Sequence, residues 1–107
     1  MNPPRRAEIS IEVRANIQSI NGGIYRIYID DTLITERTWN LSTEYAINEN
    51  ISVIVPLGRH KFKLIPINAD PGSFFLHNFH LGGRLVHPVC KSLEFDFAVD
   101  ASLPAVV

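Results

Sequence analysis

The sequence predicts an all-β protein, a single antiparallel β-sandwich of jelly-roll-like type with about eight short strands. Apolar and polar residues alternate with a period of two in several segments, which is typical of strands with one buried and one exposed face. Gly, Pro, Asn and Asp residues separate these segments at short intervals, so the connections are too short for parallel crossovers. A chain of 107 residues has room for one hydrophobic core, so we expect one domain over residues 1–107.

The N-terminal part is expected to hold three strands. Residues 8–18 alternate strictly, with Ile, Val and Ala at every odd position from residue 9 on. Asn-Gly-Gly at residues 21–23 suits a tight hairpin turn, because these residues tolerate positive φ. A return strand over residues 24–30 follows, and then a turn at residues 30–32 leads into a β-branched strand over residues 33–38.

The middle of the chain is less regular. Residues 39–50 lose the alternation, so we expect a loop there with at most one loose helical turn. Residues 51–55 form a short apolar strand, and Pro-Leu-Gly at residues 56–58 suits a β-turn. The chain returns over residues 60–65, where Pro66 either ends the strand or confines it to a sheet edge.

The C-terminal part is expected to begin with a loop at residues 68–72, which are rich in Asn, Asp, Pro and Gly. Residues 74–81 and 84–89 read as a hairpin around two glycines, and residues 93–99 as a last alternating strand. The predicted core consists of Ile9, Ile11, Val13, Ile27, Ile29, Val53, Phe62, Leu64, Phe95 and Phe97.

Charge and composition exclude several classes of protein. Ten basic and eleven acidic residues leave a net charge of −1, which argues against nucleic acid as a partner. Cys90 is the only cysteine, so neither an intrachain disulfide nor a cysteine-rich zinc site is expected. The N-terminus lacks a signal-peptide pattern, and no stretch approaches the roughly 20 apolar residues of a membrane span. We therefore expect a complete, soluble protein that is made inside a cell and has no membrane partner.

The histidines and the paired aspartates raise the question of a metal site. His77 and His80 are three residues apart, which on a regular strand places them on opposite faces. His77 and His87 could meet across the hairpin, but zinc needs three or four ligands and no carboxylate lies close in sequence. Asp30 and Asp31 carry oxygen ligands of the kind that calcium prefers, yet a hairpin turn is the better interpretation. We expect no metal.

Catalytic groups are equally sparse. Glu36, Glu44 and Glu49 lie in or near the irregular middle segment, and nothing fixes the separation that a catalytic carboxylate pair requires. We interpret them as solvated loop residues. Cys90 would need a base beside it, and no recognisable motif joins it to the nearby His87, so a buried thiol is favoured. We expect that the protein is not an enzyme and that it has no catalytic or cofactor-binding residue.

Aromatic residues cluster around the middle segment. Tyr25, Tyr28, Trp39 and Tyr45 could form a flat platform for sugar rings, since aromatic side chains combine apolar area with a polar tip. The alternative is that Trp39 covers one end of the core. Tyr28, Trp39 and Tyr45 are the candidate contacts to a partner or a glycan.

Three stretches carry a resemblance to a known class of protein. They are residues 25–39 (YRIYIDDTLITERTW), 48–51 (NENI) and 56–60 (PLGRH). With their order of strands, acidic turn, loop and Gly turn, residues 25–65 resemble small β-sandwich structural proteins of tailed phages, and also some carbohydrate-binding modules. The first resemblance implies a virion component, most plausibly a capsid decoration or cement protein, and otherwise a tail or neck part.

That resemblance implies other virion subunits as partners, a homo-oligomer, and a location in the virion after assembly in the host cytoplasm. It transfers no catalytic or binding residue to this chain. The alternative is a carbohydrate-binding module or a tail or neck adhesion protein, for which a glycan would be the ligand.

The two ends of the chain, about residues 1–6 and 101–107, are expected to act as arms that contact neighbouring subunits. Two prolines stiffen the first end, and the second exposes apolar side chains without any charged one. Alternatively, each end lies along its own sandwich and covers a strand edge. The residues expected to make the contacts are Arg5, Arg6, Leu103, Val106 and Val107.

Overall fold

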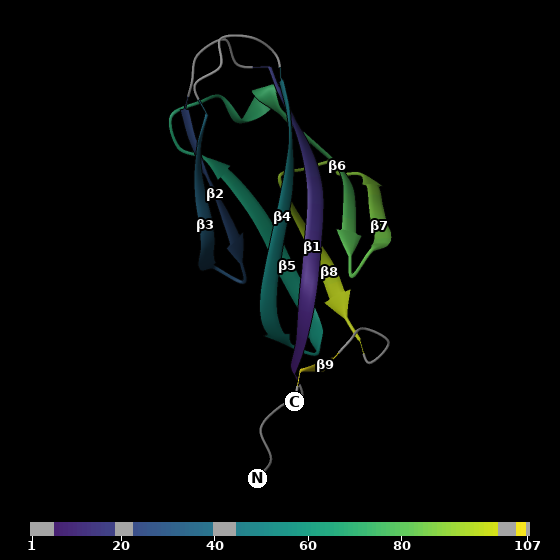
Figure 1. Cartoon of the computed structure of the whole chain (residues 1–107). Helices are drawn as coiled ribbons and strands as arrows, with labels where there is room; N and C mark the ends of the chain where they lie inside the picture. The colour runs from purple at the N-terminus through teal and green to yellow at the C-terminus, as the bar shows by residue number, and fades with distance from the viewer. Residues whose placement is uncertain (1–5, 19–22, 40–44, 101–104, 107) are drawn as a thin grey trace.

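Two antiparallel sheets pack face to face in the computed structural model, which describes residues 6–18, 23–39, 45–100 and 105–106 (Figure 1). Within these residues the first sheet has the order β4-β1-β6-β7, with a short β9 beside β1, and the second has the order β3-β2-β5-β8. The predicted all-β antiparallel sandwich is confirmed. Eight long strands in two sheets also agree with the jelly-roll-like expectation in the number of strands and sheets.

The described elements follow one another along the chain with short connections. They are β1 (Arg6–Ile17), β2 (Gly23–Ile29), β3 (Thr32–Trp39), β4 (Tyr45–Pro56), β5 (Gly58–Pro66), the 3-10 turn η1 (Pro71–Ser73), β6 (Phe74–Leu81), β7 (Arg84–Val89), β8 (Glu94–Val99) and β9 (Ala105–Val106). The predicted hairpin of residues 74–81 and 84–89 matches β6 and β7. Pro66 ends β5, which lies inside its sheet between β2 and β8.

The prediction of a loop over residues 39–50 is wrong for residues 45–50. Residues 45–50 belong to β4, which pairs with β1 from Tyr45 opposite Ile17 to Pro56 opposite Arg6. Asn48 and its even-numbered neighbours point outward, whereas the side chain of Glu49 points inward and is buried. The alternation was therefore present, but an inward charged residue concealed it.

The core lies between the sheets and is lined by alternating residues of both. Every second residue of β1 from Ala7 to Ile17 is buried. Four phenylalanines fill the centre, with ring centroids 4.7 Å apart for Phe79 and Phe95 and 5.1 Å apart for Phe62 and Phe95. Of the predicted core, Val53 and Phe95 are only partly buried and pack against it, and the others are buried.

Two hairpins stay within one sheet, and the other connections between β1 and β8 cross from sheet to sheet. The β2–β3 hairpin turns at Asp30 and Asp31, whose φ angles are 51° and 67°, as predicted for this turn. The β6–β7 hairpin turns at Gly82 and Gly83, which also have positive φ. The turn expected around residues 21 and 22 lies outside the described residues.

Candidate functional site

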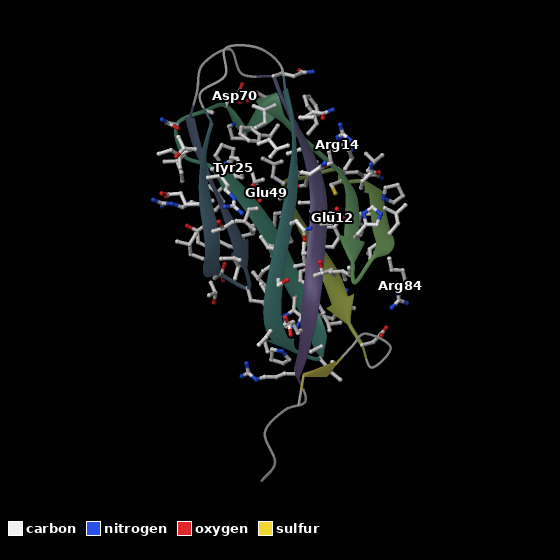
Figure 2. The ribbon with its side chains drawn as sticks, in the orientation of Figure 1. Glu12, Arg14, Tyr25, Glu49, Asp70 and Arg84 are labelled. Atoms are coloured by element: carbon white, nitrogen blue, oxygen red, sulfur yellow. The ribbon has the colours of Figure 1, made fainter. Side chains whose placement is uncertain are left out.

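A β-bulge in β6 determines which side chains share the outer face of the first sheet. Asn78 adopts a left-handed conformation with a φ of 54°, and the pairing of β1 with β6 shifts between Glu12 opposite His80 and Arg14 opposite His77. Glu12 and Arg14 both point outward from β1 (Figure 2). Directly paired residues share a face, so both histidines lie on the outer face. The expectation that they lie on opposite faces is wrong, because the bulge adds one residue to β6.

Exposed apolar side chains gather on this face next to the two histidines. Phe75, which precedes His77 on β6, is 49% exposed. On β7, Leu85 pairs with His80 and is 48% exposed, while Val89 pairs with His77 and is 72% exposed. We call these five residues the β6–β7 band. Several large apolar side chains exposed together are typical of an interaction surface, so the band is the candidate functional site.

The band extends to a free edge of the sheet. β7 pairs with β6 on one side and has no strand partner on the other among the described residues. This strand is only six residues long and contains Pro88, which has no N–H to donate. Both features limit the addition of a further strand at the edge. The face of the band, rather than the edge of β7, is therefore the surface that suits a partner.

His80 and His87 make local contacts, whereas the buried Nε2 atom of His77 has no hydrogen-bond partner among the described residues. The Nδ1 atom of His80 lies 2.9 Å from the carbonyl oxygen of Asn78. The ring of His87 packs against Phe95, and its Nε2 atom lies 3.1 Å from the carbonyl oxygen of Asp96. Among the residues with described positions, no three or more His, Cys, Asp or Glu side chains come close enough to hold a metal ion.

Asp30 and Asp31 are bound by groups of their own chain. The Asp30 carboxylate accepts hydrogen bonds from His60 Nδ1 and from the Lys61 amide, the latter at 2.8 Å, and Asp31 pairs with Lys63. Partial burial tends to raise the pKa of Asp30, but the hydrogen bonds and the His60 charge outweigh it and lower that pKa below its ordinary value. These contacts explain both aspartates as parts of a hairpin turn.

His60 is a buried polar residue that the sequence did not single out. Its Nε2 atom lies 2.6 Å from the carbonyl oxygen of Pro56, and its Nδ1 atom faces the Asp30 carboxylate. Carbonyl and carboxylate oxygens only accept, so this arrangement is satisfied when both ring nitrogens carry protons. The ring also packs against Phe97 at a centroid distance of 5.6 Å. His60 therefore links the β2–β3 turn to the β4–β5 turn.

Glu49 also differs from its expected role. It was interpreted as a solvated loop residue, but its side chain lies between the sheets and the residue is only 3% exposed. The carboxylate accepts a hydrogen bond from the hydroxyl of Tyr25, which is labelled next to it in Figure 2, and another at 3.2 Å from Arg37 Nε. Its position in phase with Ile47 and Ile51 was the signal that could have revealed this. The three residues join β2, β3 and β4 and leave no free base.

The remaining catalytic candidates have structural contacts. Glu36 forms an exposed ion pair with Arg26 directly across the β2–β3 hairpin at 2.7 Å. Cys90 is partly buried, which raises the pKa of its thiol to about 11 and keeps it protonated at neutral pH. Glu44 lies outside the described residues. No pair of these groups forms a catalytic arrangement within the part of the chain that the structure describes.

The aromatic candidates do not share one location along the β2–β3 hairpin. Tyr28 points outward from β2 near the Asp30 turn, whereas Trp39 is at the other end, opposite Gly23. The two positions are five residue steps apart along the hairpin, which corresponds to about 17 Å. Tyr45 begins β4. For Trp39 and Tyr45 the structure describes the backbone and not the side chains.

The ends of the chain meet on the first sheet where they are described. Arg6 pairs with Val106 and Ala7 with Ala105, so β9 lies along β1 of the same chain. This is the arrangement of the alternative in which an end lies along its own sandwich. Arg5, Leu103 and Val107 lie outside the described residues, and their contacts to neighbouring subunits remain a prediction.

Comparisons with known proteins assign neither a family nor a function to the chain. Within the described part of the chain, there is no helix with the length and apolar character needed to cross a bilayer. No family model, curated protein or solved structure matches the chain.

Proposed function

We propose that this protein is a structural subunit of a phage virion, of the capsid decoration or cement type, and that it is not an enzyme. The observation that carries the proposal is the β6–β7 band. Phe75, Leu85 and Val89 expose apolar area on one face of the first sheet, which fits permanent contact with another protein. The resemblance of residues 25–65 to phage structural proteins supports the virion as the setting.

The other outer face also exposes two large apolar side chains, Leu33 and Ile65, but it carries more ion pairs than the band does. On the second sheet, Arg26 pairs with Glu36, and Lys61 pairs with Glu94 at 3.2 Å. Such exposed ion pairs remain hydrated and contribute little to association. We therefore propose that the first sheet contacts the shell or a second copy of the chain through the band, while the second sheet remains in solvent.

A charge placed in the band tests this proposal. Val89→Asp should weaken association with purified virions at least tenfold, because an unpaired carboxylate would be buried in the contact. Ile54→Asp is the matched control, since Ile54 is 53% exposed on β4 of the same sheet but lies outside the band. Co-sedimentation with virions from the source of this sequence gives the affinities, and sedimentation equilibrium gives the oligomeric state.

Two results would count against the proposal. The first is equal binding of Val89→Asp and Ile54→Asp to the particles, with unchanged melting temperatures. The second is a wild-type monomer that ignores particles but binds a glycan array, with binding lost in Trp39→Ala. That second result would support the carbohydrate-binding alternative.

A further inference from the structure

A cavity opens at the side of the sandwich where β7 and β8 stop short of their neighbours. β5 continues to Pro66, three residues beyond its last pairing with β8 at Lys63. Residues 90–93 cross this gap from sheet to sheet, with the Cys90 amide donating to Leu76 and the Leu64 amide donating to Leu93. Beside this crossing lies a cavity of about 670 Å³, which we call the side pocket.

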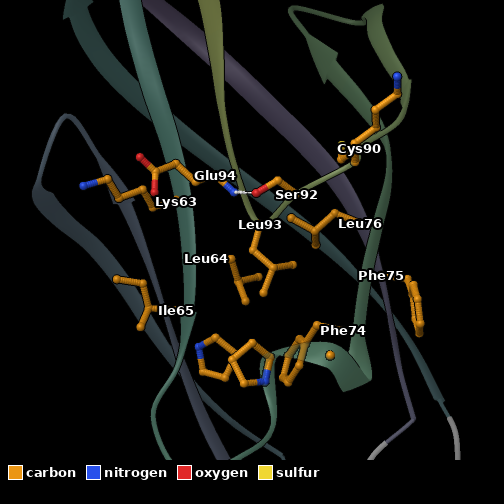
Figure 3. A pocket seen from close by; sticks show the side chains of 14 residues that line it. Lys63, Leu64, Ile65, Phe74, Phe75, Leu76, Cys90, Ser92, Leu93 and Glu94 are labelled. Atoms are coloured by element: carbon orange, nitrogen blue, oxygen red, sulfur yellow. Dashed lines mark hydrogen bonds between the residues drawn. The ribbon is translucent and has the colours of Figure 1, made fainter.

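The floor of the side pocket is apolar and continuous with the core. Leu64, Leu76 and Phe74 are buried, and Leu93 packs against them from the crossing segment (Figure 3). A cavity of this size falls in the range that holds small organic ligands, about 300–1,000 Å³. The large apolar side chains of the lining that are exposed to water are Ile65 and Phe75, so an apolar chain or ring entering the pocket would replace water mainly over these two, which favours binding.

The charges lining the pocket are not balanced. Lys63 pairs with Asp31, and Glu94 pairs with Lys61, so both have partners outside the pocket. Lys91 also lines the pocket, and its amine forms no ion pair with any residue whose position is described. Among the described residues that line the pocket, Lys91 is therefore the cation that is available to a ligand. A negative group fits it, since a cationic group would be repelled.

We propose that the side pocket binds a small monoanionic amphiphile, of the class of medium-chain carboxylates. The apolar chain lies over Leu64, Phe74 and Leu76, and the carboxylate lies at the mouth near Lys91. The Ser92 hydroxyl, which accepts a hydrogen bond from the Glu94 amide at 3.2 Å, keeps its own proton to donate to the carboxylate. This binding does not require the proposed role in a virion, although Phe75 belongs both to the β6–β7 band and to the lining of the pocket.

Competition for a fluorescent probe tests the charge of the ligand. Anilinonaphthalene sulfonate, which combines aromatic rings with one negative charge, should bind the folded protein at about one site and be displaced by decanoate. Lys91→Glu should weaken decanoate binding about fivefold or more. Arg59→Glu is the matched control, because Arg59 is exposed on β5 but does not line the pocket, and it should change binding less than twofold. Equal effects of the two substitutions would overturn the proposal.

Cys90 reports on the location of the ligand. It lines the pocket and is the only cysteine of the chain, so saturating decanoate should slow its reaction with maleimide at pH 9. Leu93→Phe, which fills the pocket, should reduce decanoate binding in a variant that melts like the wild type. If decanoate leaves the Cys90 reaction unchanged in the folded wild type, the site is elsewhere and the proposal fails. Val89→Asp should leave decanoate binding intact, which separates this test from that of the virion proposal.

Discussion

The two long sides of the sandwich are closed in different ways. On the side of β3 and β4, the buried carboxylate of Glu49 joins Tyr25 of one strand and Arg37 of another across the gap between the sheets. On the side of β7 and β8, an irregular segment crosses the gap and leaves the side pocket, which is about twice as large as the cavity of about 320 Å³ beside Glu49 on the other side. A polar link fixes side-chain positions through directional bonds, whereas apolar contacts have no preferred direction. The first side is therefore expected to be rigid and sensitive to substitution, and the second adaptable.

The largest effect is expected at the polar link. Glu49→Ala should lower the free energy of unfolding by about 2–3 kcal/mol, because it removes a buried carboxylate that accepts a hydrogen bond from the Tyr25 hydroxyl and forms an ion pair with Arg37. Glu36→Ala is the matched control, since its pair with Arg26 is exposed, and it should cost less than about 1 kcal/mol. Urea unfolding measures both losses. Equal losses would show that burial of Glu49 adds nothing to the link.

A smaller effect is expected on the side of the pocket. Leu93→Ala should cost about 1 kcal/mol, because Leu93 is only partly buried and already borders a cavity. The same urea unfolding experiment measures it, and the slope of the transition should not change. A loss as large as that of Glu49→Ala would mean that the two sides do not differ in rigidity.

The smallest effect is expected at Asp30, whose partly exposed carboxylate forms a second polar link, with His60. The pKa of Asp30 is lower in the folded protein than its ordinary value of 3.8, so its contribution to stability is present above pH 3.8 and is lost as the pH falls through the folded pKa. Because the carboxylate is largely exposed, we expect less than about 1 kcal/mol. The difference in melting temperature between wild type and Asp30→Asn should be largest above pH 3.8 and should shrink as the pH falls below that value. A constant difference would contradict this assignment.

Sequence periodicity predicted the strands in which every inward-facing position carries an apolar residue. It failed where a single charged residue occupies an inward-facing position. β1 was predictable because every inward position carries an apolar residue. β4 was not, because Glu49 occupies an inward position and looks like a loop residue until its partners are known. The His60 contacts to Asp30 and Pro56 were also unpredictable, since they join residues from separate turns. Tertiary contacts determine whether residues such as Glu49 and His60 are buried, and the pattern of a single sequence carries no information about these contacts.

The Asn78 bulge divides β6 into two halves in which the alternation of inward and outward side chains has opposite phase. Before it, the even-numbered Phe74 and Leu76 face the core, and after it the odd-numbered Phe79 and Leu81 do. Loss of this one residue would restore a uniform alternation and force one half to turn its core side chains to solvent. The length of the segment is therefore not free to vary. For β6, the number of residues is as strong a constraint as their identity.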